Sequence, residues 1–176
     1  TSGLQCHKKL WFDVHQPLKR KKAIFYGGIR FGNQVIKNYS KKEINILDLT
    51  GEFRQPVAVE KTTKAINSEN IDVIFEAAFE FSKTLVRTDV LIREPDGWVL
   101  LEAKSSTKLK PEHLPDISIQ SYVVRQSLNK LGKKLKKIKL VDINTKFILK
   151  KIGDYQGLIN DENDLTEKLN ENEIPN

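Results

Sequence analysis

Apolar residues along this chain recur with two different periods, and each period predicts a different kind of element. A spacing of three to four residues predicts helices over residues 2–14, 28–39, 59–66 and 114–131. Pro17 ends the first of these helices, whereas Pro115 fits the first turn of the last one. Gly132 follows that last helix as its C-terminal stop.

Segments rich in β-branched and aromatic residues predict strands over residues 44–49, 71–81, 85–93, 98–105 and 137–147. Glu94-Pro95-Asp96-Gly97 lies between two of these segments. Because Pro presets its own φ and Gly accepts a positive φ, we predict a hairpin there. The order of helices, three strands, helix and strand indicates a mixed α/β domain.

Length and composition narrow the class of protein. With 176 residues, 39% of them hydrophobic and 30% charged, the chain can build one domain with a substantial core. No apolar run approaches the roughly 18 residues of a membrane-spanning helix, and no secretory signal is visible, so we expect a cytoplasmic protein without a membrane partner. Because the chain begins at Thr1 and contains no Met, we expect it to be a piece of a longer parent protein.

Charge is distributed unevenly along the chain. Residues 1–153 hold 29 of the 30 Lys and Arg residues but 16 of the 23 acids, which gives this part a net charge of +13. Residues 154–176 are acidic, and we expect a tail or a linker to a missing region. A domain this basic favours a partner rich in phosphate, such as DNA. The basic loop at residues 18–22 and the lysines between residues 130 and 139 fit a DNA backbone or a solvated face.

The predicted hairpin brings charged residues together. If side chains alternate strictly, Glu102 and Lys104 share one face of their strand with Trp98. A two-residue loop places Asp89 of the partner strand opposite Lys104, and a four-residue loop places it opposite Glu102. Either loop puts Asp89, Glu102 and Lys104 on the same side of the sheet.

Two carboxylates and an ammonium in this arrangement suit phosphodiester hydrolysis. Carboxylate oxygens from two strands are the ligands that Mg²⁺ prefers, and a bound divalent cation lowers the pKa of its water. Lys104 would then orient or deprotonate that water. A ladder of ion pairs across the strands, on a solvated face, is the alternative interpretation of the same three residues.

Longer stretches around these residues resemble a known family. They are VRTDVLIREPDGWVLLEAKSSTKLKPEHLPDISIQSYVV, IFEAAF and, near the N-terminus, GLQCHKKLW. Together they resemble the PD-(D/E)XK nuclease superfamily, in the RecB-nuclease-like branch that includes the Cas-four exonucleases of CRISPR adaptation. More narrowly, they resemble a bacterial family of unknown function that carries this nuclease domain. The resemblance covers most of residues 2–147.

The resemblance implies a restriction-endonuclease-like core, in which a central mixed β-sheet is flanked by helices. It implies Mg²⁺ or Mn²⁺ as the cofactor, held by Asp89 and Glu102 with the Ala103 carbonyl as a further ligand, and Lys104 as the catalytic lysine. Gln120 falls where this branch has a helix motif associated with DNA placement and lysine orientation.

Two further acids match the narrower family. Glu76 in IFEAAF is either an additional metal ligand or a strand acid facing Arg87 or Arg93. Asp116 matches as well, but capping and helix-dipole effects already explain an acid at the start of a helix.

The chain departs from the Cas-four pattern in two respects. That pattern has Gly-x-x-x-His on an early helix, whereas here Gly28 is followed by Gly32 at the His position. The pattern also has four cysteines that hold an iron–sulfur cluster, whereas this chain has only Cys6 and cannot form one. We interpret Cys6 as a small buried apolar residue. We interpret His7, His15 and His113 as surface or capping residues.

These observations lead to a hypothesis of a metal-dependent, exonuclease-like deoxyribonuclease. We expect its DNA contacts at Arg87, Arg93, Lys108, Tyr122, Lys133 and Lys134. The alternative is a catalytically inactive module that keeps the nuclease fold and binds nucleic acid or docks to a partner. A third interpretation is a soluble α/β protein with charged sheet edges.

Overall fold

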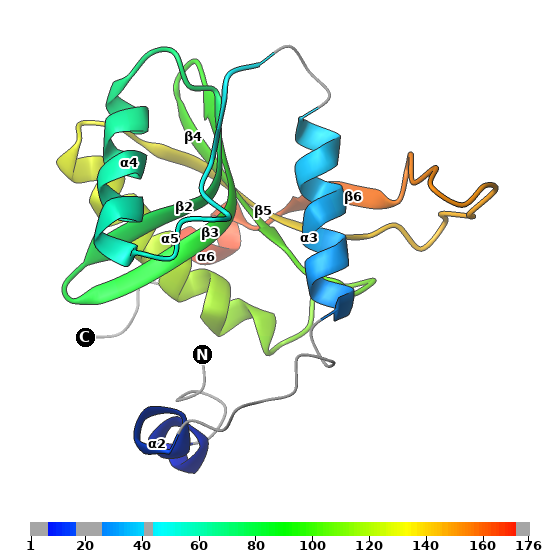
Figure 1. Ribbon diagram of the computed structural model, residues 1–176, viewed down its shortest axis with the longest axis horizontal. Helices are drawn as coiled ribbons and strands as arrows, with labels where there is room; N and C mark the ends of the chain where they lie inside the picture. Colours follow the sequence, from blue (N-terminus) through cyan, green and yellow to red (C-terminus); the bar gives the residue numbers. More distant parts are fainter. Residues whose placement is uncertain (1–6, 17–25, 41–43, 172–176) are drawn as a thin grey trace.

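A mixed β-sheet runs through the centre of the molecule (Figure 1). The computed structural model describes residues 7–16, 26–40 and 44–171. Within these residues, six strands lie in one sheet in the order in which they occur in the sequence. They are β1 (Ile46–Asp48), β2 (Val73–Phe81), β3 (Thr84–Glu94), β4 (Gly97–Ala103), β5 (Leu135–Ile143) and β6 (Ile159–Asp164). The predicted α/β class, with a mixed sheet flanked by helices, is confirmed.

The directions of the strands follow from the lengths of their connections. Strands β2, β3 and β4 are antiparallel neighbours joined by short turns. By contrast, β1 pairs with β2 and β4 pairs with β5 in parallel, which requires a longer crossover. The helices α4 (Gln55–Asn67) and α5 (His113–Lys130) form these two crossovers. Finally, β6 pairs antiparallel with β5.

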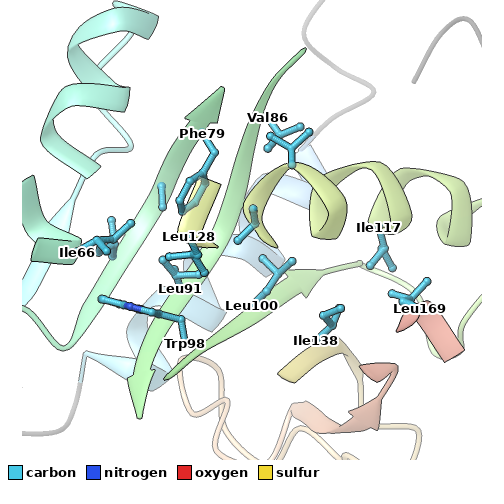
Figure 2. Packing of buried hydrophobic residues seen from close by; sticks show 14 of the residues in the cluster. Ile66, Phe79, Val86, Leu91, Trp98, Leu100, Ile117, Leu128, Ile138 and Leu169 are labelled. Carbon is cyan, nitrogen blue, oxygen red and sulfur yellow. The ribbon is translucent and has the colours of Figure 1, made fainter. Parts of the chain in front are cut away.

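Helices cover both faces of the sheet. On one face, α4, α5 and α6 (Thr166–Glu171) pack against the larger core cluster, which Figure 2 shows from close by. The aromatic ring of Trp98 and the side chains of Leu91, Leu100 and Ile138 lie at its centre and are fully buried. On the other face, α3 (Tyr26–Tyr39) presses Phe31 and Val35 onto a second cluster of strand residues. This three-layer arrangement buries both sides of the central strands.

The helix predictions are confirmed with modest shifts at their ends. The predicted helix over 2–14 corresponds to α2 (His7–His15), whose side chains Trp11 and Val14 are exposed. Cys6, Pro17 and the basic loop 18–22 lie outside the described residues. Gly132 ends the turn after α5 with φ of 68°, as expected of a C-terminal stop.

The β3–β4 hairpin has the second of the two registers that the sequence allows. Glu94 pairs with Gly97 and Val90 pairs with Leu101. Extended by one residue, this register would place Asp89 opposite Glu102, but the ladder ends at Val90 and Leu101. Gly97 has φ of 152°, and a Cβ atom there would lie 2.8 Å from the backbone oxygen of Lys134. Glycine is therefore required by this close approach as well as by its φ.

The acidic segment is part of the fold, and our prediction of a tail from residue 154 is wrong for residues 159–171. Strand β6 extends the sheet beyond β5, where the buried carboxylate of Asp142 accepts hydrogen bonds from the side chains of Asn160 and Asn163. Leu165 and Leu169 then enter the larger core cluster. The hydrogen bonds from the two asparagines to Asp142 and the burial of the two leucines outweigh the low strand propensity of this acidic sequence.

Side chains of β2 and β3 alternate between the two faces of the sheet, but in the middle of both strands this alternation shifts by one residue, which we call the phase break. Ile74 and Phe79 lie in the same core cluster, as do Leu91 and Val86, although each pair is an odd number of residues apart. At the break, Glu76 adopts a positive φ of 54°. Our prediction that strict alternation places Asp89 on the face of Leu91 and Trp98 is therefore wrong.

Candidate active site

The candidate site lies where β3 separates from β4. The ladder between these strands ends at Val90 and Leu101. Beyond this point the backbone N–H of Ala103 donates to Asp89 Oδ2 at 2.6 Å. The Asp89 carboxylate thus takes the place that a backbone carbonyl of β3 would otherwise occupy. This contact brings Asp89 to the end of β4 even though the phase break removes it from the predicted face.

Lys104 joins carboxylates from a strand and a helix. Its ammonium nitrogen lies 2.7 Å from Glu102 Oε1 and 3.2 Å from Asp116 Oδ2. Asp116 belongs to the first turn of α5, which packs against this face of the sheet. The capping explanation of Asp116 therefore missed an ion pair with Lys104. The sequence signal for this ion pair was an acid in the first turn of the first helix after Lys104.

Asp89, Glu102 and Lys104 line one cavity of about 470 Å³. The Glu76 side chain lines it as well, next to the phase break in β2. The opposite wall comes from α3, at Gly32, Asn33, Val35 and Ile36. An added Cβ at Gly32 would meet no atom within 4 Å. The lining of the cavity includes the buried carboxylate of Glu102.

The pKa values of Asp89 and Glu102 are shifted upward from those of ordinary carboxyl groups. Burial raises the pKa of Asp89 to about 8, and the neighbouring charge of Glu102 acts in the same direction. Burial also raises the pKa of Glu102, although the Lys104 ammonium opposes this effect. Burial disfavours the charge on Lys104, but Glu102 and Asp116 outweigh it and raise the pKa of Lys104. Lys104 is therefore a cation at neutral pH.

The donor set fits a divalent cation. Glu102 is 4% exposed, and its Oε2 atom has no hydrogen-bond partner among the described residues. The side chain of Gln120 on α5 lies beside Glu102, where a hydrogen bond between them lowers the pKa of Glu102, and Gln120 Oε1 is buried without a partner among the described residues. Oxygen atoms of this kind, together with the Asp89 carboxylate and waters, suit Mg²⁺ or Mn²⁺. The described part of the chain holds no cluster of three acidic, His or Cys side chains arranged as a complete metal cage, so waters would have to complete the coordination.

Glu76 is the strand acid facing Arg87 that the sequence allowed, and its role as a metal ligand stays a prediction. It lines the cavity near Asp89 and it also forms an ion pair of 3.1 Å with Arg87 Nε. The other nitrogens of this guanidinium donate at 2.7 Å to the backbone oxygens of Glu52 and Leu49. Arg87 thus holds the loop before α4 against β3, and its contact with DNA stays a prediction.

Arg93 is also committed to internal contacts. Its guanidinium stacks over the Trp98 ring at 4.3 Å and donates to backbone oxygens at the end of α4 and in the loop that follows, including those of Ser68 and Ile71. These bonds satisfy carbonyl groups that the helix end leaves open. Arg93 therefore has a structural role at the end of α4, and its contact with DNA stays a prediction as well.

The remaining expected DNA contacts lie at different places. Lys108 is exposed in the loop between Lys104 and α5, and Tyr122 is 39% exposed on α5 and packs edge-on against Phe81. Lys133 and Lys134 lie at the other end of β4, where Trp98 N donates to Lys134 O. At about 3.3 Å per residue, that end is roughly 13 Å from Glu102. Of these residues, Lys108 is the nearest along the chain to Lys104, which lines the cavity.

His113 begins α5, and its Nδ1 atom accepts a hydrogen bond from Lys110 N at 3.3 Å. His15 is exposed at the end of α2. These positions agree with surface and capping roles. No helix in the described part of the chain is long and apolar enough to cross a membrane.

Comparisons with known proteins do not identify the family. No family profile matches this chain, and no curated protein matches it. Among solved structures, "Crystal structure of SSO0001" aligns at a TM-score of 0.26 and 16% identity, covering 69% of this chain and 74% of that chain. A likeness this weak carries no argument about fold or function.

Proposed function

We propose that this chain is a metal-dependent nuclease with a restriction-endonuclease-like core, which hydrolyses phosphodiester bonds in DNA. One observation carries the proposal. Asp89 from β3 and Glu102 from β4 meet in one cavity with Lys104 at 2.7 Å from Glu102, and both carboxyl groups have raised pKa values. Burying two acids beside a single ammonium and without a bound metal ion is costly, because desolvation opposes their charge.

Each residue has a distinct task in this proposal. Asp89 and Glu102 supply the oxygens that hold Mg²⁺ or Mn²⁺, and the Ala103 carbonyl is the further ligand that the family resemblance implies. The bound cation lowers the pKa of a water and stabilises the charge on the phosphate in the transition state. Because Lys104 is a cation between Glu102 and Asp116, it orients that water and stabilises negative charge rather than removing a proton.

The resemblance to PD-(D/E)XK nucleases supports the same assignment. Gln120 on α5 lies on the side of the sheet that holds Glu102 and Lys104, which suits its proposed task of orienting this end of the site. Gly32 lines the cavity at the position where the related pattern has His. In the proposed nuclease, water or Glu76 takes the place of that imidazole.

An inactive nucleic-acid-binding module is the second candidate. The observation in its favour is that Lys104 already neutralises Glu102, while Ala103 N satisfies one oxygen of Asp89. These contacts lower the cost of burying the acids without a metal. Such a module would bind DNA in a salt-dependent manner without carboxylate-dependent binding of Mn²⁺.

Cleavage of end-labelled single-stranded and duplex DNA tests the nuclease proposal. We expect cutting in Mg²⁺ or Mn²⁺, none in EDTA, and a loss on the order of 10²-fold or more in Lys104→Gln, which removes the cation but keeps a polar side chain. Lys64→Gln is the matched control, because Lys64 is exposed on α4 and pairs with Glu60 at 2.6 Å, away from the cavity.

The cleavage assay and a metal titration together can also refute the nuclease proposal. If neither cation supports cutting and calorimetric titration shows equal Mn²⁺ binding in the native chain and in Glu102→Gln, the nuclease proposal fails. Salt-sensitive DNA binding under those conditions would support the inactive module.

A further inference from the structure

The connection between β5 and β6 projects away from the sheet as an arm, residues 144–158 (Figure 1). Its outer part, residues 148–157, is exposed throughout. The arm carries large apolar side chains into solvent, with Ile148 77% exposed and Ile152 88% exposed. Leu149 and Tyr155 add to this surface. Apolar side chains gathered on a projecting segment, rather than scattered singly, are typical of an interaction surface.

The base of the arm is fixed and lies next to the candidate site. Asn144 N donates to Leu158 O at 2.8 Å, and the Asn144 side chain donates to Gly157 O at 2.9 Å. Just before the arm, Ile143 N donates at 2.8 Å to Ser106 O. Ser106 follows Lys104 by two residues. The arm therefore leaves the sheet at the end where Glu102 and Lys104 lie.

Basic side chains interleave with the apolar ones. The arm contains Lys146, Lys150 and Lys151 against a single acid, Asp154. All three lysines are exposed. Ammonium groups that flank bare isoleucine side chains complement a surface on which anionic groups border apolar faces. Duplex DNA has this character, because phosphates border stacked bases.

We propose that the arm is a duplex-DNA-binding element, in which the lysines contact phosphates and Ile148 and Ile152 wedge against the bases beside the cleaved strand. This inference rests on the proposed function for the choice of DNA and for the position of the cut. The arm has no helix that would align its apolar residues into a stripe, as binding to a membrane surface by an amphipathic helix requires. Its charge, and a base bonded to the segment that follows Lys104, favour DNA over a second copy of the chain.

Two double variants of the arm, one at its lysines and one at its isoleucines, separate the tasks of these side chains in the full chain. They are made in the Lys104→Gln background, so that the DNA stays intact, and binding to a labelled duplex is followed by fluorescence anisotropy. Lys150→Gln/Lys151→Gln should make the slope of log affinity against log salt shallower by about two, since each phosphate contact contributes about 0.9. Lys64→Gln/Lys83→Gln, with two exposed lysines outside the arm, should leave the slope unchanged.

The apolar side chains are tested with 2-aminopurine in the duplex, whose fluorescence rises when bases unstack. The Lys104→Gln chain should raise this signal, and Ile148→Ser/Ile152→Ser should lose most of the rise and weaken binding roughly tenfold while keeping the salt slope. Val14→Ser, an exposed apolar residue on α2, is the control.

The outcomes distinguish this inference from the nuclease proposal. If the native chain cuts DNA but the arm variants bind and unstack the duplex as the Lys104→Gln chain does, the arm proposal fails while the nuclease proposal stands. If no cutting occurs but the arm variants lose duplex binding, the arm proposal stands alone. Loss of self-association in sedimentation, or of binding to anionic vesicles, with unchanged DNA binding, would overturn the DNA-binding role.

Discussion

The carboxyl group of Asp89 couples the candidate site to the stability of the protein. In the unfolded chain it titrates near its ordinary pKa of 3.8, whereas burial and Glu102 raise the pKa to about 8 in the folded state. Between these values the folded state binds more protons than the unfolded state. Stability contributed by the protonated group is therefore present at low pH and is lost as pH rises toward 8.

Asp89→Asn removes this titration while keeping the size of the side chain and an oxygen for Ala103 N. We expect the variant to be more stable than the native chain at pH 8, by about 2 kcal/mol, and to lose less stability between pH 5 and pH 8. Urea unfolding in EDTA at several pH values measures both. Parallel pH dependence in the two proteins would contradict the raised pKa of Asp89.

Single residues show how far a sequence specifies a site. Asp89, Glu102 and Lys104 were identifiable because they lie close together in a hairpin whose turn is evident. The internal contacts of Arg87 and Arg93 were not identifiable, because their partners are backbone oxygens of α4 and its flanking loops. A pattern of residue types contains no signal for a carbonyl group that a distant segment leaves open.

At the scale of elements, the phase break in β2 and β3 decides what the two strands present to the cavity. Glu76 adopts a φ of 54°, which costs a residue with a Cβ about 1 kcal/mol relative to glycine. The same residue pairs with Arg87. Its conformation and its charge thus act on stability in opposite directions.

Two substitutions at Glu76 separate these contributions. Both Glu76→Ala and Glu76→Gly lose the ion pair with Arg87, but only glycine relieves the positive φ. We expect Glu76→Gly to be more stable than Glu76→Ala by about 1 kcal/mol, measured by urea unfolding. At an ordinary extended position in a strand, alanine is the more stable of the two, so that order would contradict the phase break.

The helices and strands of this chain differ in how well they can be predicted from the sequence. The strands β2 to β4 and the helix α5 were predictable, because apolar periodicity, a Pro-containing turn and a terminal Gly all agree. Strand β6, with the sequence INDEND, was not, because its polar residues match a solvated tail. Its place in the sheet depends on Asp142 of β5, whose buried carboxylate binds two of its asparagines. The phase break was also invisible, since nothing in VIFEAAFEF distinguishes Glu76.

At the scale of the whole molecule, the C-terminal segment closes the larger core. Leu169 on α6 is 4% exposed and belongs to the cluster that contains Trp98 and Ile138. Leu169→Ala should lower the free energy of unfolding by about 2–4 kcal/mol, because it leaves a cavity in that cluster. Urea unfolding followed by circular dichroism measures this loss.

Leu149→Ala in the exposed arm is the matched control, and its effect should be within about 0.5 kcal/mol. If both leucines gave the same small effect, β6 and α6 would not belong to the cooperative unit. A single transition that moves to lower urea in Leu169→Ala alone would place residues 159–171 in the same folding unit as the central sheet.

The order of strands in the sheet, which equals their order in the sequence, has a consequence for biosynthesis. Each strand after β1 leaves the ribosome when the preceding strand, with which it pairs, is already made, so no strand has to be inserted between two others. The hairpins from β2 to β4 close over short loops and are entropically the cheapest to form early. Strand β1 can then pair with the free edge of β2, while β5 and β6 add beyond β4. Each of these strands adds to an exposed edge of the sheet.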